Sequence, residues 1–369
     1  MLYRVMDKGE LPKLVQAFME SYEVVGPVER EGRFIFDVIG SPDEIALDYS
    51  QTASSAKKYL MPSNETLMRF DARMNLVEDY VEQVRPRVVF GLHTCDISAL
   101  NRLDVALLQG KYVDPYFKAR RDATLIIGIS CTPNQNCFCH LLGSDEAPFG
   151  YDLFLHDIGG KYLVSMANVE ATNILEAACE LNEATDADRI AFRQQTRARQ
   201  SAFNPEIPHI QDVAMLMDVF HSDPFWEQLG SRCLSCSACA SVCPTCFCFD
   251  IRDVLEPDGQ SGARERVWDA CTNPGFAQVT GGHNFRPTGR ERVRHRMYHK
   301  LNGFMVNHDR MLCVGCGRCV TACKTGINPI EVLRFFQSKG SADMQLESGD
   351  PDRRLADLEQ GGEEAADAQ

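Results

Sequence analysis

Two short stretches of this chain hold four cysteines each at the same spacing, and this repeat constrains the fold more than any other feature. CLSCSACASVC begins at Cys233 and CVGCGRCVTAC begins at Cys313, and both follow the pattern C-x2-C-x2-C-x3-C. The chain has 369 residues and 16 cysteines in all. Its first residues contain no apolar segment of the kind that directs secretion, so we expect a cytoplasmic location. Clustered cysteines in that compartment favour metal binding over disulfides.

The spacing predicts two [4Fe–4S] clusters with crossed ligation, in which three thiolates of one run share a cluster with the last thiolate of the other. Pairs of zinc sites are the alternative, because four thiolates also suit tetrahedral zinc. Three closely spaced cysteines with a distant fourth fit a cubane [4Fe–4S] cluster better than they fit a zinc site. The first expected set is Cys233, Cys236, Cys239 and Cys323. The second expected set is Cys313, Cys316, Cys319 and Cys243.

The interval between the runs is 69 residues long, far longer than in a compact ferredoxin. The flanking segments PFWEQLGSRC and PIEVLRFFQSK have helical patterns. We therefore expect an all-helical two-cluster ferredoxin domain over residues 206–340. Lys324 replaces the proline that usually follows such a run, which is a mild departure from the pattern.

Residues 1–205 have the pattern of a mixed α/β domain, so the predicted fold class of the whole chain is α+β. Residues 87–93 and 123–130 are apolar and rich in β-branched side chains, which predicts buried strands. The segment between them predicts a helix with Asp96 as its N-cap. Residues 152–167 predict a hairpin that turns at Gly159 and Gly160. Two helices are expected after it, the first carrying Cys179 on its apolar face.

Four more cysteines follow the two predicted strands and predict a third [4Fe–4S] cluster. Because both loops leave the same end of neighbouring strands, their thiols are expected to converge. A structural zinc site is the alternative. His93 and His140 are close enough in sequence to replace a ligand, but we expect them to tune the cluster through hydrogen bonds. The four predicted ligands are Cys95, Cys131, Cys137 and Cys139.

Three further cysteines, Cys246, Cys248 and Cys271, are left without an assigned role. They are expected to lie near a cluster without binding it, and a fourth metal site is the alternative. The segment from Arg286 to Lys300 carries five arginines and one lysine against a single glutamate. This basic segment is either a solvated basic helix or a segment that offsets the negative charge of the clusters and could also contact a partner protein.

Composition excludes several classes of function. The net charge of −14 argues against nucleic-acid binding. No apolar run approaches the roughly 18 residues that a membrane span requires. Residues 341–369 carry nine acids and two arginines, so we expect an acidic, disordered tail. Neither a nucleotide-binding glycine motif nor a catalytic triad is present, so no catalytic residue is assigned and we do not expect the chain to be catalytic alone.

Between residues 85 and 335 the order of motifs resembles one known family. The motifs are GLHTCDISALNRLD, NQNCFCH, CLSCSACASVCPTCFCFD, VWDAC, GGHNFR and CVGCGRCVTAC. This set resembles the beta subunit of cytosolic [NiFe] hydrogenase/sulfur reductases, the sulfhydrogenases. The related iron–sulfur subunit of anaerobic sulfite reductases is similar. The resemblance implies an iron–sulfur electron carrier with three clusters, placed between a catalytic module and a flavin subunit that handles NAD(P)H.

The leading hypothesis is an electron-transfer subunit with three [4Fe–4S] clusters that serves both the small subunit of a [NiFe] hydrogenase and a flavin subunit. An electron relay in a sulfite reductase is the first alternative. A self-contained iron–sulfur reductase is the second, although four cysteines at the third site leave no iron open for substrate.

Overall fold

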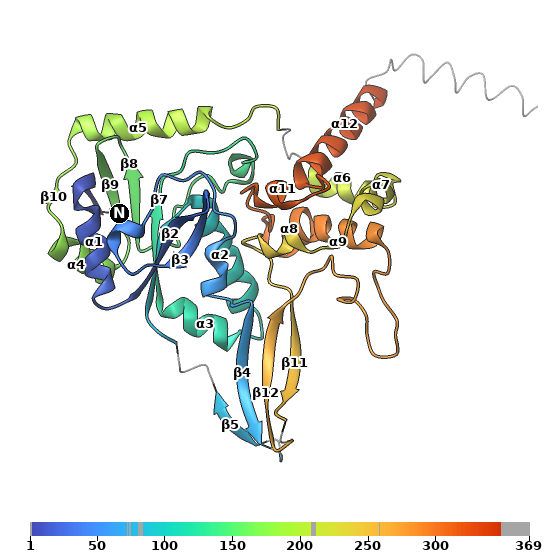
Figure 1. The fold of residues 1–369 in the computed structure, drawn as a ribbon. Coiled ribbons are helices and arrows are strands. Elements are labelled where there is room, and N and C mark those ends of the chain that lie inside the picture. The colour runs from blue at the N-terminus through green and yellow to red at the C-terminus, as the bar shows by residue number, and fades with distance from the viewer. Residues whose placement is uncertain are drawn as a thin grey trace, which may run out of the picture.

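The computed structural model describes residues 2–347, apart from residues 72, 74, 80–83, 208–211 and 258. Its first part is built on an eight-stranded sheet with the order β10-β1-β9-β8-β7-β6-β2-β3 (Figure 1). Strands β2, β6, β7 and β8 pair in parallel, and the other pairs are antiparallel. The strands are β1 (Leu2–Asp7), β2 (Glu23–Arg30), β3 (Arg33–Val38), β6 (Arg87–Leu92), β7 (Thr124–Ile129), β8 (Leu153–Asp157), β9 (Lys161–Met166) and β10 (Leu181–Asn182).

Helices cover both faces of this sheet, because its central strands are apolar on both sides. Val88 and Phe90 of β6 pack in one core with α1 and α4, whereas Val89 packs in the opposite core with α2 and α3. This alternation is the period of two expected for a strand. The helices are α1 (Leu11–Met19), α2 (Thr94–Leu108), α3 (Pro115–Asp122) and α4 (Val169–Ala178).

The strands predicted at 87–93 and 123–130 are confirmed as β6 and β7, which are parallel neighbours. The hairpin predicted at 152–167 is confirmed as β8 and β9. Helices α4 and α5 (Asp186–Ser201) follow as expected. Cys179 does not lie on the face of α4 as expected, because the helix ends at Ala178, but its side chain is partly buried against the core.

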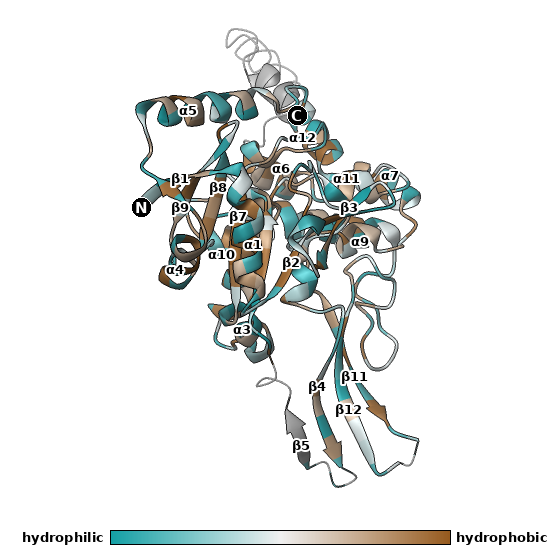
Figure 2. Ribbon diagram, turned by 60° about the vertical axis from the view of Figure 1, so that its left-hand side comes forward, coloured by the Kyte–Doolittle hydropathy of each residue, from teal (hydrophilic) through white to brown (hydrophobic). Residues whose placement is uncertain are grey.

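A second sheet overturns part of the predicted fold. Its order is β11-β12-β4-β5, with β4 (Asn64–Asp71), β5 (Leu76–Asp79), β11 (Phe249–Leu255) and β12 (Ser261–Trp268). The hairpin β11–β12 lies between the two cysteine runs, so the prediction that residues 206–340 are all-helical is wrong. The helical segments beside each run led to that prediction, whereas the interval pairs with β4 from far earlier in the chain. Figure 2 shows this sheet extending away from the rest of the molecule.

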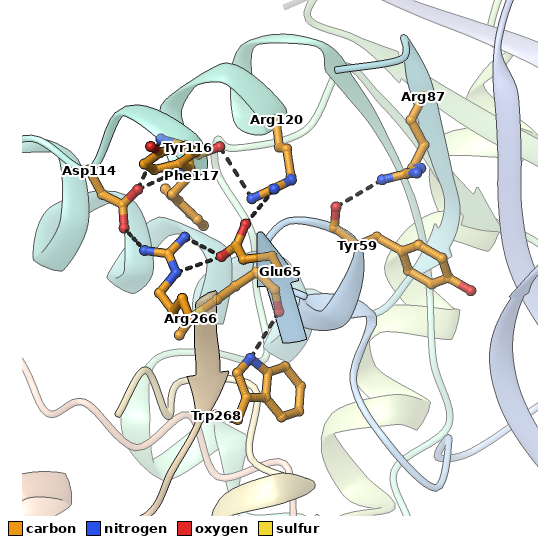
Figure 3. Close-up of polar contacts among 10 residues, drawn as sticks. Tyr59, Glu65, Arg87, Asp114, Tyr116, Phe117, Arg120, Arg266 and Trp268 are labelled. Atoms are coloured by element: carbon orange, nitrogen blue, oxygen red, sulfur yellow. Dashed lines mark hydrogen bonds and ion pairs between the residues drawn. The ribbon is translucent and has the colours of Figure 1, made fainter. Parts of the chain in front are cut away.

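A buried group of charges joins this sheet to the first part of the chain (Figure 3). Arg266 of β12 donates to Glu65 of β4 at 2.5 Å and to Asp114, the N-cap of α3. Arg120 of α3 also pairs with Glu65. The side chains of Glu65 and Arg266 are each 5% exposed. Because water cannot reach these buried groups, each charge depends on its oppositely charged partner. The ion pairs therefore fix β4, β12 and α3 together.

The remaining helices surround the cysteine runs and share one apolar core. Trp226, Met297, Leu333 and Phe336 are buried in it. Phe138, from the cysteine loop after β7, is buried in the same core, so this core includes a side chain from before residue 205. The helices are α6 (Val213–Val219), α7 (Phe225–Arg232), α8 (Ala238–Ser241), α9 (Gly289–Leu301), α10 (Gly303–His308), α11 (Arg318–Ala322) and α12 (Pro329–Glu347). The predicted tail from 341 begins inside α12, and residues 348–369 lie outside the described residues.

Candidate iron–sulfur sites

The first candidate site combines thiols from both cysteine runs. Three cysteines of the first run line one cavity together with the last cysteine of the second run. Arg296 of α9 reaches the same cavity, and its Nε donates to the sulfur of Cys239 at 3.1 Å. The structure thus brings together the set expected from crossed ligation, which is Cys233, Cys236, Cys239 and Cys323.

The second candidate site lies deeper in the molecule. Burial raises the pKa of Cys316 to about 12, and Cys243 is among the charges that raise it further. The pKa of Cys319 is raised by burial and then by Cys313, Cys243 and Cys316. Cys243 therefore lies among the thiols of the second run although it belongs to the first. This grouping is again the one that crossed ligation predicts.

The third candidate site is at the carboxyl ends of β6 and β7. Cys95 is in the first turn of α2, and Cys139 begins the short helix η5 (Cys139–Leu142). These two thiols and Cys137 are buried in one cluster. Cys131 interacts electrostatically with Cys137 and Cys139, and burial raises its pKa to about 11. All four predicted thiols therefore converge, as the edge of a parallel sheet leads one to expect.

The loop of the second run is packed directly against this third site. The amide of Phe138 donates to the carbonyl of Gly315 at 2.8 Å. Gly315 has a φ of +65°, and a Cβ there would lie 2.6 Å from the backbone nitrogen of Cys139. Only glycine tolerates both this conformation and this approach. Cys316 consequently lies in the same buried cluster as Cys95 and Cys137.

The donor chemistry of the three sets fits [4Fe–4S] clusters. Each set offers four thiols from two separate parts of the chain, and a cubane takes its four ligands on four different irons. Among the described residues, no three His, Cys, Asp or Glu side chains converge closely enough to hold one metal ion.

Helix α9 places buried cations among the thiols. Arg292, Arg296 and Lys300 are four residues apart, so they lie on one face of the helix. All three are less than 9% exposed. Arg296 interacts with Cys239 of the first site and with Cys319 and Cys243 of the second. Arg292, Arg296 and Lys300 are thus buried on one face of α9, and the contacts of Arg296 with the thiols favour a role for this face in offsetting cluster charge.

Asp96 and His93 lie beside the third site, and their places at the start of α2 differ from what the local sequence indicates. Asp96 is not the N-cap of its helix, because α2 begins at Thr94 with His93 as its N-cap. Asp96 instead binds Arg318, a partner that the local sequence could not indicate. His93 is buried and stacks on Tyr49 with 4.0 Å between ring centroids. Burial lowers the pKa of His93 to about 3, so the ring is neutral.

The three unassigned cysteines lie next to the second site. Cys246 is buried and packs with Cys243. The Cys248 thiol is hydrogen-bonded to Cys271, which is itself buried. Lys57 donates to the carbonyl of Cys246 at 2.7 Å. They therefore lie near thiols of the second candidate site, and the expectation that they bind no cluster stays a prediction.

Comparison with known proteins identifies the family. Residues 232–327 match the family model of a 4Fe–4S dicluster domain. The chain is 33% identical over 334 residues to sulfhydrogenase 2 subunit beta of Pyrococcus furiosus, covering 90% of this chain and 98% of that protein. Within the described residues, no helix is both long and apolar enough to span a membrane. The chain therefore belongs to the sulfhydrogenase beta subunit family and is an iron–sulfur electron-transfer subunit.

Proposed function

We propose that this chain carries three [4Fe–4S] clusters and relays electrons between a [NiFe] hydrogenase module and an NAD(P)H-linked flavin subunit. The clusters would supply one-electron carriers. The observation that carries the proposal is that twelve thiols lie in three adjacent sets of four. The proposed ligands are Cys233, Cys236, Cys239 and Cys323 at the first site, Cys313, Cys316, Cys319 and Cys243 at the second, and Cys95, Cys131, Cys137 and Cys139 at the third.

The contacts between sites support a linear order for the relay. The second site is next to the third, because the loop around Gly315 packs on Cys139. It is also next to the first, because Arg296 interacts with thiols of both. The second site is thus the central one, and electrons that enter at one end of the chain of sites leave at the other.

The first site, at one end of this order, is exposed to solvent. Cys236 of the first site is exposed, and the neighbouring Leu234 is 67% exposed. The exposure of Cys236, a proposed cluster ligand, leaves the first site open to contact with a partner protein. We assign the hydrogenase small subunit to one end and the flavin subunit to the other. The relative's name, subunit beta of a sulfhydrogenase, supports a complex of this kind.

Native purification of the tagged chain tests the assignment of partners. We expect a flavin subunit to co-purify with it, together with the small subunit of a [NiFe] hydrogenase. The isolated chain should be reduced by dithionite but not by NAD(P)H, and adding the flavin subunit should make it reducible by NAD(P)H. Recovery of a sulfite reductase catalytic subunit instead would contradict the hydrogenase assignment.

A further inference from the structure

A large cavity of about 1120 Å³ adjoins the third site. Residues 129–132, at the carboxyl end of β7, line it, and Cys131 is among them. Helix α5 lies across the ends of β8 and β9, and its side chains line the same cavity (Figures 1 and 2). In α/β proteins ligands bind outside the carboxyl ends of parallel strands, which is where this cavity lies.

The walls of the cavity are rich in aromatic side chains. Tyr49, Tyr151, Phe154, Tyr162 and Phe192 all line it. They come from the loop before β4, from the sheet and from α5, so they surround the space from several sides. Aromatic walls of this kind favour a flat, conjugated ligand through stacking and edge contacts.

One cation that lines this space has an N–H group without a hydrogen-bond partner. Arg199 of α5 lines the cavity, and its Nε is buried and bonded to nothing among the described residues. Its charge acts on both Cys131 and His156, which line the same cavity. His156 is occupied by a hydrogen bond of 2.9 Å to Ser165. Arg199 as a whole is half-buried, but its Nε–H is shielded from water, and an unpaired buried N–H is costly unless a ligand accepts from it.

We propose that this cavity binds a flavin, with the isoalloxazine ring between the aromatic walls and its pyrimidine edge toward Arg199 and Cys131. The cavity volume of about 1120 Å³ is slightly above the usual range for small-molecule sites, about 300–1,000 Å³, and far exceeds the need of a small oxyanion. A nicotinamide ring fits less well chemically, because it transfers a hydride, whereas iron–sulfur centres exchange single electrons.

The ring's position gives it a defined redox role, which rests on the proposed third cluster. The oxidised ring takes two electrons, one at a time, from the iron–sulfur side and one proton from water, and becomes the anionic hydroquinone. The reverse step returns two electrons and releases the proton. Arg199 stabilises the negative charge that the reduced ring gains beside it.

Titration of the full-length, anaerobically reconstituted chain with FMN tests the proposal, with quenching of flavin fluorescence as the readout. We expect saturable binding of about one FMN per chain. Arg199→Gln should weaken FMN binding by about tenfold or more, because a hydrogen bond to a charged group usually contributes that much to affinity. Thr196→Trp, which fills the cavity from α5 without removing a charge, should abolish it. Arg197→Gln on the exposed side of α5 is the matched control and should bind FMN normally.

Riboflavin separates recognition of the ring from recognition of the phosphate. It should bind within a few-fold of FMN if the ring occupies the aromatic walls, and loss of binding would overturn the proposed position of the ring. Absence of FMN binding in a chain with full iron content, or tighter binding of NADH than of FMN, would overturn the flavin site and leave the relay intact. A low iron content with normal FMN binding would contradict the proposed clusters instead.

Discussion

Asp96 and Arg318 form a bidentate ion pair that fixes the third candidate site to the second. The guanidinium donates to the two carboxylate oxygens at 2.8 and 2.7 Å. Their side chains are only 3% and 2% exposed. Arg318 also donates to the carbonyl and hydroxyl oxygens of Thr52. Asp96 directly follows Cys95, and Arg318 directly precedes Cys319, so this one pair fixes two cysteine loops relative to each other.

Arg318→Gln should destabilise the chain strongly. The substitution leaves the Asp96 carboxylate buried without its cation, and breaking a buried pair in this way costs about 3–5 kcal/mol. Because both loops lose their connection, we also expect iron to be lost faster from the reconstituted chain. Anaerobic thermal unfolding and iron retention under a chelator would measure the two effects.

The pair of Arg232 and Glu331 provides the matched control. It is also bidentate, at 2.8 and 2.7 Å, but its side chains are 43% and 30% exposed. Solvent-exposed pairs contribute about 0–1 kcal/mol, so Arg232→Gln should change the unfolding temperature little. Equal loss of stability in the two variants would contradict the role assigned to burial.

The number of clusters can be counted directly. Three cubanes predict about 12 iron and 12 acid-labile sulfide per reconstituted chain. Cys95→Ser should lower both to about eight, because the third site loses a ligand that lies far from the other three in sequence. Cys179→Ser is the control, since that thiol packs against the apolar core and should leave the iron count unchanged. About eight irons in the unsubstituted chain would show that the third site holds no cluster.

Crossed ligation makes a different prediction for each of two serine variants. Cys243→Ser should perturb the EPR signal of the second site, where Cys313, Cys316 and Cys319 lie, because Cys243 interacts with those thiols. Cys323→Ser should perturb the first site, whose cavity Cys323 lines. If each substitution altered the site of its own run instead, Cys243 would be a ligand of the first site and Cys323 a ligand of the second. That result would contradict crossed ligation.

Much of this architecture could be predicted because its signals are local. The spacing of the cysteines depends on a single loop, and the strands β6 and β7 are marked by continuous apolar runs. The convergence of Cys95 with Cys137 followed from the rule that neighbouring parallel strands end at one edge.

The parts that failed have two different causes. The hairpin β11–β12 does carry a local signal, since FDIRDVL alternates and a turn containing Pro257 and Gly259 follows it, but the helical segments beside the cysteine runs were extended over the whole interval. Its pairing with β4, almost 200 residues earlier, has no local signal. Asp96 has a typical N-cap residue type, but its partner Arg318 is 222 positions away. Close approaches such as that of Gly315 to Cys139 likewise exist only once the two loops are packed together.

The iron-free chain should lose stability at high pH. Burial raises the pKa of Cys131 to about 11, above the ordinary value of about 8.5. The folded state therefore favours the neutral thiol, and this contribution is fully present below about pH 8.5 and is lost as the pH rises toward 11. Urea midpoints of the apo chain between pH 8 and 11 should fall less steeply in Cys131→Ala than in the unsubstituted chain. Parallel slopes in the two proteins would contradict the raised pKa.

Arg296 should raise the reduction potential of the sites that it contacts. Its Nε donates to the sulfur of Cys239 at 3.1 Å, and it is only 4% exposed. A buried cation favours the reduced cluster, which carries one more negative charge. We therefore expect Arg296→Met to lower the potential of the first site by roughly 60 mV, a tenfold change in a one-electron equilibrium.

A redox titration followed by EPR would measure this shift. Arg294→Gln on the same helix is the control, because Arg294 donates to the carbonyl of His221, away from the thiol sets. The second site should shift in the same direction as the first, since Arg296 also interacts with Cys319 and Cys243. The third site should keep its potential, because the thiols with which Arg296 interacts most are Cys239, Cys319, Cys246 and Cys243, none of which belongs to that site. A uniform shift at all three sites would point to a general loosening of the fold, whereas a shift confined to the first two would tie the potential to this one buried charge.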